Sequence, residues 1–244
     1  MIPKTIHYCW FGENPKSELI KKCIESWKEF APDFDIVEWN KTNFDISKYK
    51  YAKQAYEKKK YAFVSDVARF DVLNTYGGIY LDTDVELIKP IERLLNNNLF
   101  MGYDQKGLIA TGLIMGSEPK KEMLEEILEY YSKKSFLLQN KLPDNTTVVT
   151  IVSDILKGNG FILNGDYYED PSTLTLYPSE VFDPFDYEND RMKITDSTIS
   201  IHHYAASWKS ENDKRIYRIG KLIKKIVGNH AYDKIARIKH KIIG

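Results

Sequence analysis

The sequence predicts an α/β fold in which a mixed sheet is flanked by helices, followed by a basic helical extension. Three observations support this prediction. Short apolar segments typical of buried strands alternate with longer segments whose apolar residues recur at helical spacing. The later strands favour a mixed order over a purely parallel one. Residues 209–244 are rich in Lys and Arg and also show helical spacing.

The expected elements follow one another along the chain. We expect the first helix over residues 17–30, with Ser17 as its N-cap and Leu19, Cys23 and Trp27 on its buried face. Residues 63–76 form a second amphipathic pattern, which ends at a Gly-Gly pair. Strands are expected near residues 5–10, 35–39, 79–81, 99–103, 108–115, 174–177 and 198–204.

Two charged residues share one face of the helix expected over 63–76. Asp66 and Arg69 are three residues apart, so we expect both to point toward the strand that follows. One interpretation is a structural ion pair only. The other is a binding pair in which Asp66 accepts hydrogen bonds from sugar hydroxyls and Arg69 neutralises phosphate or orients Asp66.

Two carboxylates follow the strand expected over 79–81. Asp82 and Asp84 flank Thr83 where this apolar segment ends, and ligands bind at such strand ends in open α/β sheets. Hard oxygen ligands with open positions suit Mn²⁺ or Mg²⁺ together with a diphosphate. The alternative is a solvated acidic turn without a ligand.

The strand expected over 198–204 contains two adjacent histidines. Period-two alternation puts Ile199 and Ile201 on the same face as His203, and His202 on the opposite face. Because the isoleucines mark the buried face, we expect His202, rather than His203, to be the metal or phosphate ligand. A histidine that is only hydrogen-bonded is the alternative.

Three separated segments resemble the DXD-containing glycosyltransferases of family 32, which include fungal mannosyltransferases, bacterial capsule enzymes and, more distantly, clostridial glucosylating toxins. The first segment is Ile2-Pro3-Lys4-Thr5-Ile6-His7-Tyr8-Cys9-Trp10-Phe11-Gly12. The second comprises Ser65, Asp66, Arg69, Gly77, Gly78, Ile79, Tyr80, Asp82 and Asp84, and the third is Ile201-His202-His203-Tyr204-Ala205-Ala206-Ser207-Trp208. The acceptor-side region lacks the Gly-Pro pair that many relatives carry.

The resemblance implies a GT-A fold, a nucleotide-sugar donor, a divalent metal and retention of anomeric configuration. By resemblance, Trp10 stacks on the nucleotide base and Asp84 is the direct metal ligand. The remaining matches concern the donor. Asp66 and Arg69 hold its sugar, Ser65 and Tyr80 join the donor-binding set, Asp82 lies near the ribose and metal, and Ser207 and Trp208 close over the diphosphate.

The implied reaction moves a sugar, from a UDP-sugar or from GDP-mannose, to a hydroxyl of a glycan or lipid-linked saccharide. Synthesis of capsule or surface polysaccharide is the expected setting. We expect a catalytic domain over 1–208 and a cytoplasmic protein, because no basic segment leading into an apolar run follows Met1. Cys9 and Cys23 are expected to be buried thiols.

The formal net charge of zero hides an asymmetry between the two parts of the chain. Residues 209–244 hold eleven lysines and arginines against Glu211, Asp213 and Asp233, a net charge of +8, which leaves residues 1–208 at −8. Two interpretations of this tail stay open. It packs on the domain with a solvated face, or it lies on an anionic membrane at the inner face of the cell. Nucleic acid is not expected as a partner, because the tail has few aromatic residues.

Two other functions fit part of the sequence. Asp82-Thr83-Asp84-Val85 matches the opening motif of haloacid-dehalogenase-type phosphatases, in which Asp82 would be the nucleophile and Asp84 the acid/base. That motif normally lies close to the N-terminus, whereas here a full αβ unit precedes it. A non-catalytic carbohydrate-binding domain is the second alternative.

Overall fold

The computed structural model describes residues 1–186 and 191–205. A seven-stranded mixed sheet organises these residues, in the order β2-β1-β3-β6-β5-β8-β7. β1 (Thr5–Cys9) pairs in parallel with β2 (Asp35–Trp39) and with β3 (Gly78–Tyr80). β6 (Met115–Ser117) runs antiparallel between β3 and β5 (Leu99–Gly102), and β8 (Leu174–Tyr177) lies parallel to β5 and antiparallel to β7 (Tyr168–Asp170). The expected mixed α/β sheet is confirmed.

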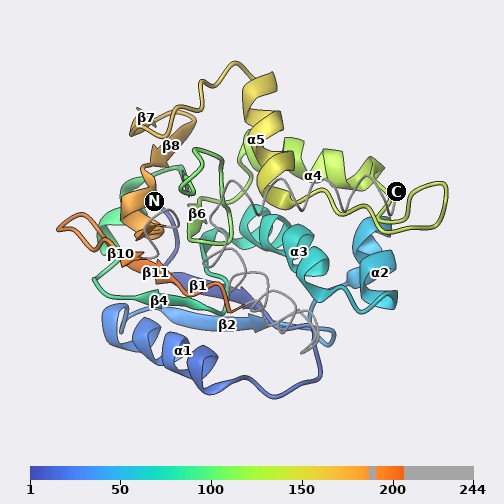
Figure 1. Ribbon diagram of the computed structural model, residues 1–244, viewed down its shortest axis with the longest axis horizontal. Coiled ribbons are helices and arrows are strands. Elements are labelled where there is room, and N and C mark those ends of the chain that lie inside the picture. Colours follow the sequence, from blue (N-terminus) through green and yellow to red (C-terminus); the bar gives the residue numbers. More distant parts are fainter. Residues whose placement is uncertain (187–190, 206–244) are drawn as a thin grey trace, which may run out of the picture. The chain divides into compact units, whose positions relative to one another are not determined.

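Helices cover both faces of the sheet (Figure 1). One hydrophobic core lies beneath α2 (Lys50–Glu57), α3 (Tyr61–Tyr76), α4 (Glu122–Lys133) and α5 (Val148–Gly158). The other core includes Trp27 of α1 (Glu18–Phe30) and Phe182 of the short α6 (Ser179–Phe182). β1 supplies both, because its side chains alternate between faces: Ile6 and Tyr8 enter the second core, and Cys9 enters the first.

The polar face of β1 also carries a buried histidine. His7 is 2% exposed, and both of its ring nitrogens are hydrogen-bonded. Trp39 Nε1 donates to His7 Nδ1 at 3.1 Å, so His7 Nε2 carries the proton and donates to the carbonyl of Gly77 at 2.9 Å. Burial lowers the pKa of His7 to about 4, which keeps the ring neutral. This histidine therefore joins β1, β2 and the end of α3.

α3 leads directly into β3 through a tight turn. Its C-cap, Gly77, adopts φ 68°, and a Cβ there would lie 2.9 Å from Pro3 Cδ and from Pro119 Cδ. The expected helix end at the Gly-Gly pair is confirmed. At the N-terminus of α1, Ser17 accepts a hydrogen bond from the Ile20 amide, as expected for its capping role.

Two details of the sequence prediction were wrong. Leu19 is only partly buried, and Ile20 takes the buried position beside Cys23 and Trp27 on α1. The expected strand over 108–115 is confined to its last residue, Met115, which opens β6. Upstream the chain makes turns and one isolated bridge between Tyr103 and Ile109. Apolar residues over this stretch pack against the core without continuous pairing, which a periodicity argument cannot distinguish from a strand.

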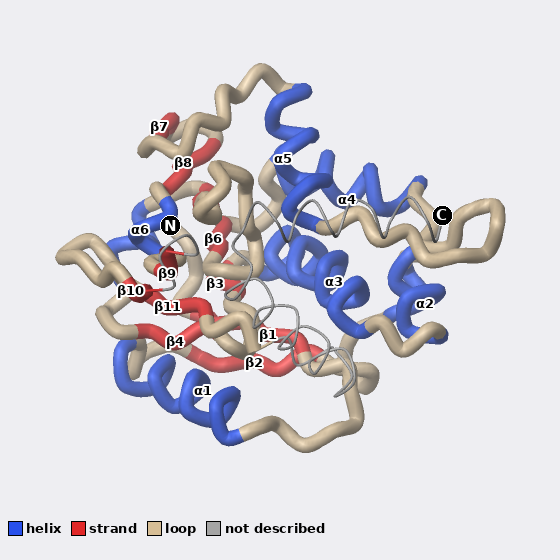
Figure 2. The backbone as a smooth tube through the Cα atoms, viewed as in Figure 1, coloured by secondary structure: helices blue, strands red, loops and turns tan. Residues whose placement is uncertain are grey.

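A separate two-stranded sheet lies beside the main one (Figure 2). β4 (Val85–Leu87) pairs antiparallel with β11 (Ser200–His202), and Val85 faces His202 in register. This pairing brings the last described strand next to the Asp82–Asp84 segment. A further two-stranded sheet joins β9 (Phe185–Asp186) and β10 (Arg191–Met192).

Two further findings concern the cysteines and membrane-spanning helices. Cys9 and Cys23 are free and buried, as expected, and burial raises the pKa of each thiol to about 12. Among the described residues, no helix combines the length and apolarity needed to cross a bilayer. The predicted tail over 209–244, with its proposed membrane contact, lies outside the described residues.

Candidate metal and donor site

Three side chains converge where β3 ends and β11 pairs with β4. Asp82, Asp84 and His202 each offer a ligand atom, and these atoms all lie within 4.8 Å of one another. Asp82 and Asp84 lie in the turn between β3 and β4, and His202 ends β11. The structure thus brings together the three residues that the sequence analysis selected as metal ligands, although 118 positions separate Asp84 from His202.

Asp82 is held in one orientation by its neighbours. Its Oδ1 accepts hydrogen bonds from Tyr80 Oη at 2.9 Å and from Arg69 Nη2 at 3.2 Å. Its Oδ2 faces Gly112, where a Cβ would lie only 2.1 Å away. The Asp82 amide donates to the Gly112 carbonyl at 3.1 Å. Oδ1 is therefore hydrogen-bonded within the protein, and Oδ2 has room only because residue 112 is glycine.

Arg69 links the expected pair on α3 to the acidic turn. Its Nη2 lies 3.0 Å from Asp66 Oδ1 as well as 3.2 Å from Asp82 Oδ1, and its Nη1 donates to Thr111 Oγ1 at 3.3 Å. Its side chain is only 4% exposed. Burial raises the pKa of Asp66 to about 7, even though the attraction of Arg69 opposes the shift. Arg69 therefore forms ion pairs with two carboxylates in a buried environment.

His202 lies against the second carboxylate of the turn. Its Nε2 is 3.1 Å from Asp84 Oδ1, and its side chain is 13% exposed. Burial alone would lower the pKa of His202, but the charge and hydrogen bond of Asp84 raise it overall. Its Nδ1 is buried and has no hydrogen-bond partner among the described residues. The neighbouring His203 instead contacts Glu86 Oε2 at 2.7 Å.

Four residues near this site were missed by the sequence analysis. Thr111 and Gly112 belong to the irregular segment that was predicted to be a strand. Tyr204 packs its ring on His202 with centroids 4.0 Å apart, and its hydroxyl donates to Oδ2 of the fully buried Asp183 at 2.6 Å. A glycine after a threonine could have signalled a turn, but no sequence signal connects Asp183 with Tyr204.

The other predicted donor-binding residues fall in two groups. Trp10 is partly exposed just after β1; its Nε1 donates to the Asn14 carbonyl at 3.1 Å, and Lys16 Nζ lies 5.5 Å from its ring centroid. Ser65 is partly buried on α3, and its hydroxyl donates to the Tyr61 carbonyl. Ser207 and Trp208 lie outside the described residues.

The donor set fits a divalent cation. Two carboxylates and one imidazole are ligands that Mn²⁺ accepts, and Mg²⁺ is compatible with the carboxylates. Asp82 Oδ2 has no hydrogen-bond partner among the described residues. In a neutral ring whose proton is on Nδ1, the His202 Nε2 would be the ligand atom. Asp82, Asp84 and His202 would hold such an ion.

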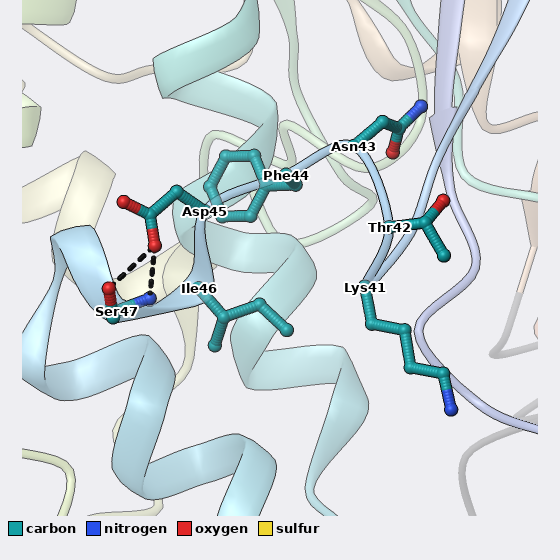
Figure 3. Close-up of a pocket in the computed structure, with 7 residues that line it drawn as sticks. All are labelled: Lys41, Thr42, Asn43, Phe44, Asp45, Ile46 and Ser47. Atoms are coloured by element: carbon teal, nitrogen blue, oxygen red, sulfur yellow. Dashed lines mark hydrogen bonds between the residues drawn. The ribbon is translucent and has the colours of Figure 1, made fainter.

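The site lies apart from a surface hollow formed by residues 41–47. Figure 3 shows an open hollow of about 530 Å³, formed by the single segment from Lys41 to Ser47 after β2. Asp45 faces Ser47 there and accepts hydrogen bonds from its amide and hydroxyl, so this carboxylate is used to shape the turn. No residue predicted for the functional site lines this hollow.

Comparison with known proteins concerns the part of the chain that contains Asp82 and Asp84. Residues 17–101 match the family described as "Glycosyltransferase sugar-binding region containing DXD motif". This stretch contains Asp66, Arg69, Tyr80, Asp82 and Asp84. The match confirms the resemblance to DXD-containing glycosyltransferases that the sequence indicated.

This chain matches individual relatives over only part of their length. An uncharacterized glycosyltransferase of Acanthamoeba polyphaga mimivirus is 32% identical over 152 residues, which is 57% of this chain and 58% of that protein. Inositol phosphoceramide mannosyltransferase 3 of Schizosaccharomyces pombe is 31% identical over 39% of this chain and 28% of its own length.

One solved structure spans most of this chain. A glycosyltransferase involved in the glycosylation of the major capsid of PBCV-1 aligns with a TM-score of 0.49 and 13% identity, over 88% of this chain and 98% of that one. At this level of similarity the alignment does not bear on the function.

Proposed function

We propose that this chain, a member of the DXD-containing glycosyltransferases, transfers a sugar from a nucleoside diphosphate to an acceptor hydroxyl. One observation carries the proposal: Asp82 and Asp84 of the DXD motif meet His202 within 4.8 Å, beside a buried arginine that orients the first acid. A solvated acidic turn would need neither the buried histidine nor the arginine.

The ligand roles follow from the hydrogen bonds around each acid. Tyr80 and Arg69 both donate to Oδ1 of Asp82, and the ligand atoms of Asp82, Asp84 and His202 lie within 4.8 Å of one another. Mn²⁺ or Mg²⁺ bound by Asp82, Asp84 and His202 would neutralise the charge that develops on a departing diphosphate. Preorganised ligands of this kind cost no reorganisation when that charge appears.

The sugar of the donor would lie near the α3 pair. Asp66 is 8% exposed, and in its ionised form it would accept hydrogen bonds from sugar hydroxyls while Arg69 stabilises its charge. The partly exposed indole of Trp10, tethered to Asn14, would stack on the base. Ser65 would line the same donor subsite, and Ser207 with Trp208 would close over the diphosphate.

The stereochemical course and the partners extend the proposal. As the glycosidic bond breaks, the sugar acquires oxocarbenium character, and the proposed outcome is retention. Front-face attack and a covalent intermediate are both compatible with the geometry. We propose a glycan or lipid-linked saccharide as acceptor and UDP-sugars, or GDP-mannose, as donors. A lipid acceptor is supported by the name of the S. pombe relative, an inositol phosphoceramide mannosyltransferase. Surface-polysaccharide synthesis and peripheral membrane binding through 209–244 remain proposals.

The test is donor-dependent release of nucleoside diphosphate by the full chain. UDP-sugars and GDP-sugars are incubated with the protein in Mn²⁺ and in EDTA, and a generic phosphomonoester is run in parallel. The proposal predicts release of UDP or GDP from one donor class, only in Mn²⁺, with no hydrolysis of the phosphomonoester. Phosphomonoester hydrolysis without donor turnover would contradict it and favour the phosphatase interpretation.

A further inference from the structure

Tyr204 has an unusual backbone conformation beside the proposed metal site. It lies two residues after His202 and adopts φ 48°, in the left-handed region that bulky side chains avoid. The other described non-glycine residues with positive φ are Lys59, Lys120 and Lys141, all exposed. Strained backbone of this kind persists where surrounding contacts hold it, and such positions are concentrated at functional sites.

Contacts with His202 and Asp183 help to hold the Tyr204 side chain in place. Its ring packs on the His202 imidazole at a centroid distance of 4.0 Å and an interplanar angle of 63°. Its hydroxyl donates to Asp183 Oδ2 at 2.6 Å. Tyr204 is 42% exposed, whereas Asp183 is fully buried. A ring that packs edge-on against the histidine is thus tied to an interior carboxylate.

Asp183 is itself a fixed anchor. It follows α6, its amide donates to the Ser179 carbonyl at 2.7 Å, and its own carbonyl accepts from Gln105 Nε2. Its Oδ1 has no hydrogen-bond partner among the described residues, so Tyr204 is the side-chain donor that this carboxylate receives there. Burial of this carboxylate is costly, and the hydrogen bonds from the Tyr204 hydroxyl and the Phe185 backbone offset part of that cost.

Among residues 1–186 and 191–205, the His202 ring has no second hydrogen bond to fix it. Nδ1 is buried without a partner, and Nε2 faces Asp84. A histidine that binds a metal through Nε2 must give up the proton on that atom, and the hydrogen bond to Asp84 is lost with it. Metal-bound histidines are usually oriented by a partner on the other nitrogen. Here the Tyr204 ring packs against the imidazole.

We infer that Tyr204, anchored by Asp183, is a positioning residue that holds the His202 ring in the orientation required to bind a divalent cation through Nε2. The inference rests on the proposed function, since it assigns a role to residues that support the metal site. Tyr204 acts through His202 and touches neither metal nor substrate in this assignment. Loss of its hydroxyl would leave the ring stacked but unanchored, and loss of its ring would release the histidine.

The experiment measures Mn²⁺ affinity of the full chain by electron paramagnetic resonance of free Mn²⁺, without donor. Tyr204→Phe is expected to weaken binding about tenfold and Tyr204→Leu about 100-fold. Asp183→Asn keeps an acceptor for the Tyr204 hydroxyl and is expected to stay within about threefold of wild type. Tyr49→Phe is the matched control, because Tyr49 also donates its hydroxyl to a carboxylate, Asp71 Oδ1, at 2.9 Å.

A second readout separates positioning from general damage. Saturating Mn²⁺ should restore the kcat of Tyr204→Phe, and its melting temperature should match that of Tyr49→Phe within about 3 °C. Equal Mn²⁺ affinity in wild type and Tyr204→Phe, or equal weakening in Tyr49→Phe, would overturn the inference and leave the proposed function standing. Wild-type protein that binds no Mn²⁺ would overturn the proposed metal dependence and this role together.

Discussion

His7 and His202 are both largely buried histidines at strands of this domain, but their surroundings differ. His7 satisfies both ring nitrogens, one through Trp39 and one through Gly77, and burial lowers its pKa to about 4. His202 has Nε2 on Asp84 and an Nδ1 that has no partner in the described part of the chain, and its pKa is raised. The first arrangement is complete without a ligand, whereas the second leaves binding capacity unused.

The difference teaches how to separate structural from functional polar groups in this fold. Buried polar atoms are normally paired, so a buried imidazole with one unpartnered nitrogen, whose other nitrogen faces a carboxylate, departs from the ordinary structural arrangement. His7 joins β1, β2 and the end of α3, while the proposed role of His202 is to provide a metal ligand beside the DXD turn. The predictions below test this division, beginning with the largest effect.

Removing Asp84, the acid beside His202, should have the largest effect on activity. Asp84→Ala takes away one carboxylate ligand and the partner of His202, so donor turnover should fall by about 10²–10³ or more. Nucleoside diphosphate release at saturating Mn²⁺ measures it. Asp154→Ala, at an exposed position of α5, is the control and should retain full turnover. Unchanged turnover in Asp84→Ala would remove this acid from the site.

The space around the first acid provides a second test. In Gly112→Ala the new Cβ would lie 2.1 Å from Asp82 Oδ2, so the carboxylate must move. Misplacement on this scale can cost about 10²-fold in turnover. Gly158→Ala is the matched control, since a Cβ there meets nothing within 4 Å. Equal activity of the two alanine variants would show that the position of Asp82 is not critical.

Alanine at each histidine should affect different properties. His7→Ala leaves the Trp39 N–H and the Gly77 carbonyl without their partner and opens a cavity, so the free energy of unfolding should fall by about 2–4 kcal/mol. His202→Ala should change it by about 1 kcal/mol or less, while turnover at limiting Mn²⁺ falls about 10–100-fold. Urea unfolding and donor turnover measure the two effects. If both variants lost stability equally and activity equally, the division between the two histidines would be wrong.

The smallest effect concerns pH. The pKa of His7 is lowered in the folded state, so below its ordinary value of 6.5 the unfolded chain binds a proton that the folded chain excludes. The stability due to neutral His7 is therefore fully present above pH 6.5 and is lost as the pH falls to about 4, by up to about 3 kcal/mol. Urea unfolding between pH 7 and pH 4.5 should show a steeper loss in wild type than in His7→Asn. Parallel curves would contradict the assignment.

The sequence predicted the parts of this site that local periodicity encodes. Alternation along the strand near 198–204 selected His202, and helical spacing put Asp66 and Arg69 on one face, where the structure joins them to Asp82. The reason given for selecting His202 was incomplete, because Ser200 on its face is as buried as Ile199 on the other. Both faces of β11 are covered here, which alternation alone cannot show.

The missed residues depend on contacts between distant, irregular segments. Gly112 approaches Asp82 because residues 108–114 turn instead of forming the expected strand. Asp183 and Tyr204 meet only because α6 and β11 are adjacent in the fold. Long-range contacts of this kind leave no period in the sequence, so they become visible only once the elements are packed.

The central claim is that Asp82, Asp84 and His202 form a divalent-metal site that binds a nucleotide-sugar donor. The most direct measurement is a thermal-shift series of the full chain with UDP-sugars and GDP-sugars, each with Mn²⁺ and with EDTA. The account predicts that one donor class raises the melting temperature in Mn²⁺ and not in EDTA, because binding to the folded state stabilises it. The same shift in EDTA, or no shift with any donor in Mn²⁺, would contradict the account.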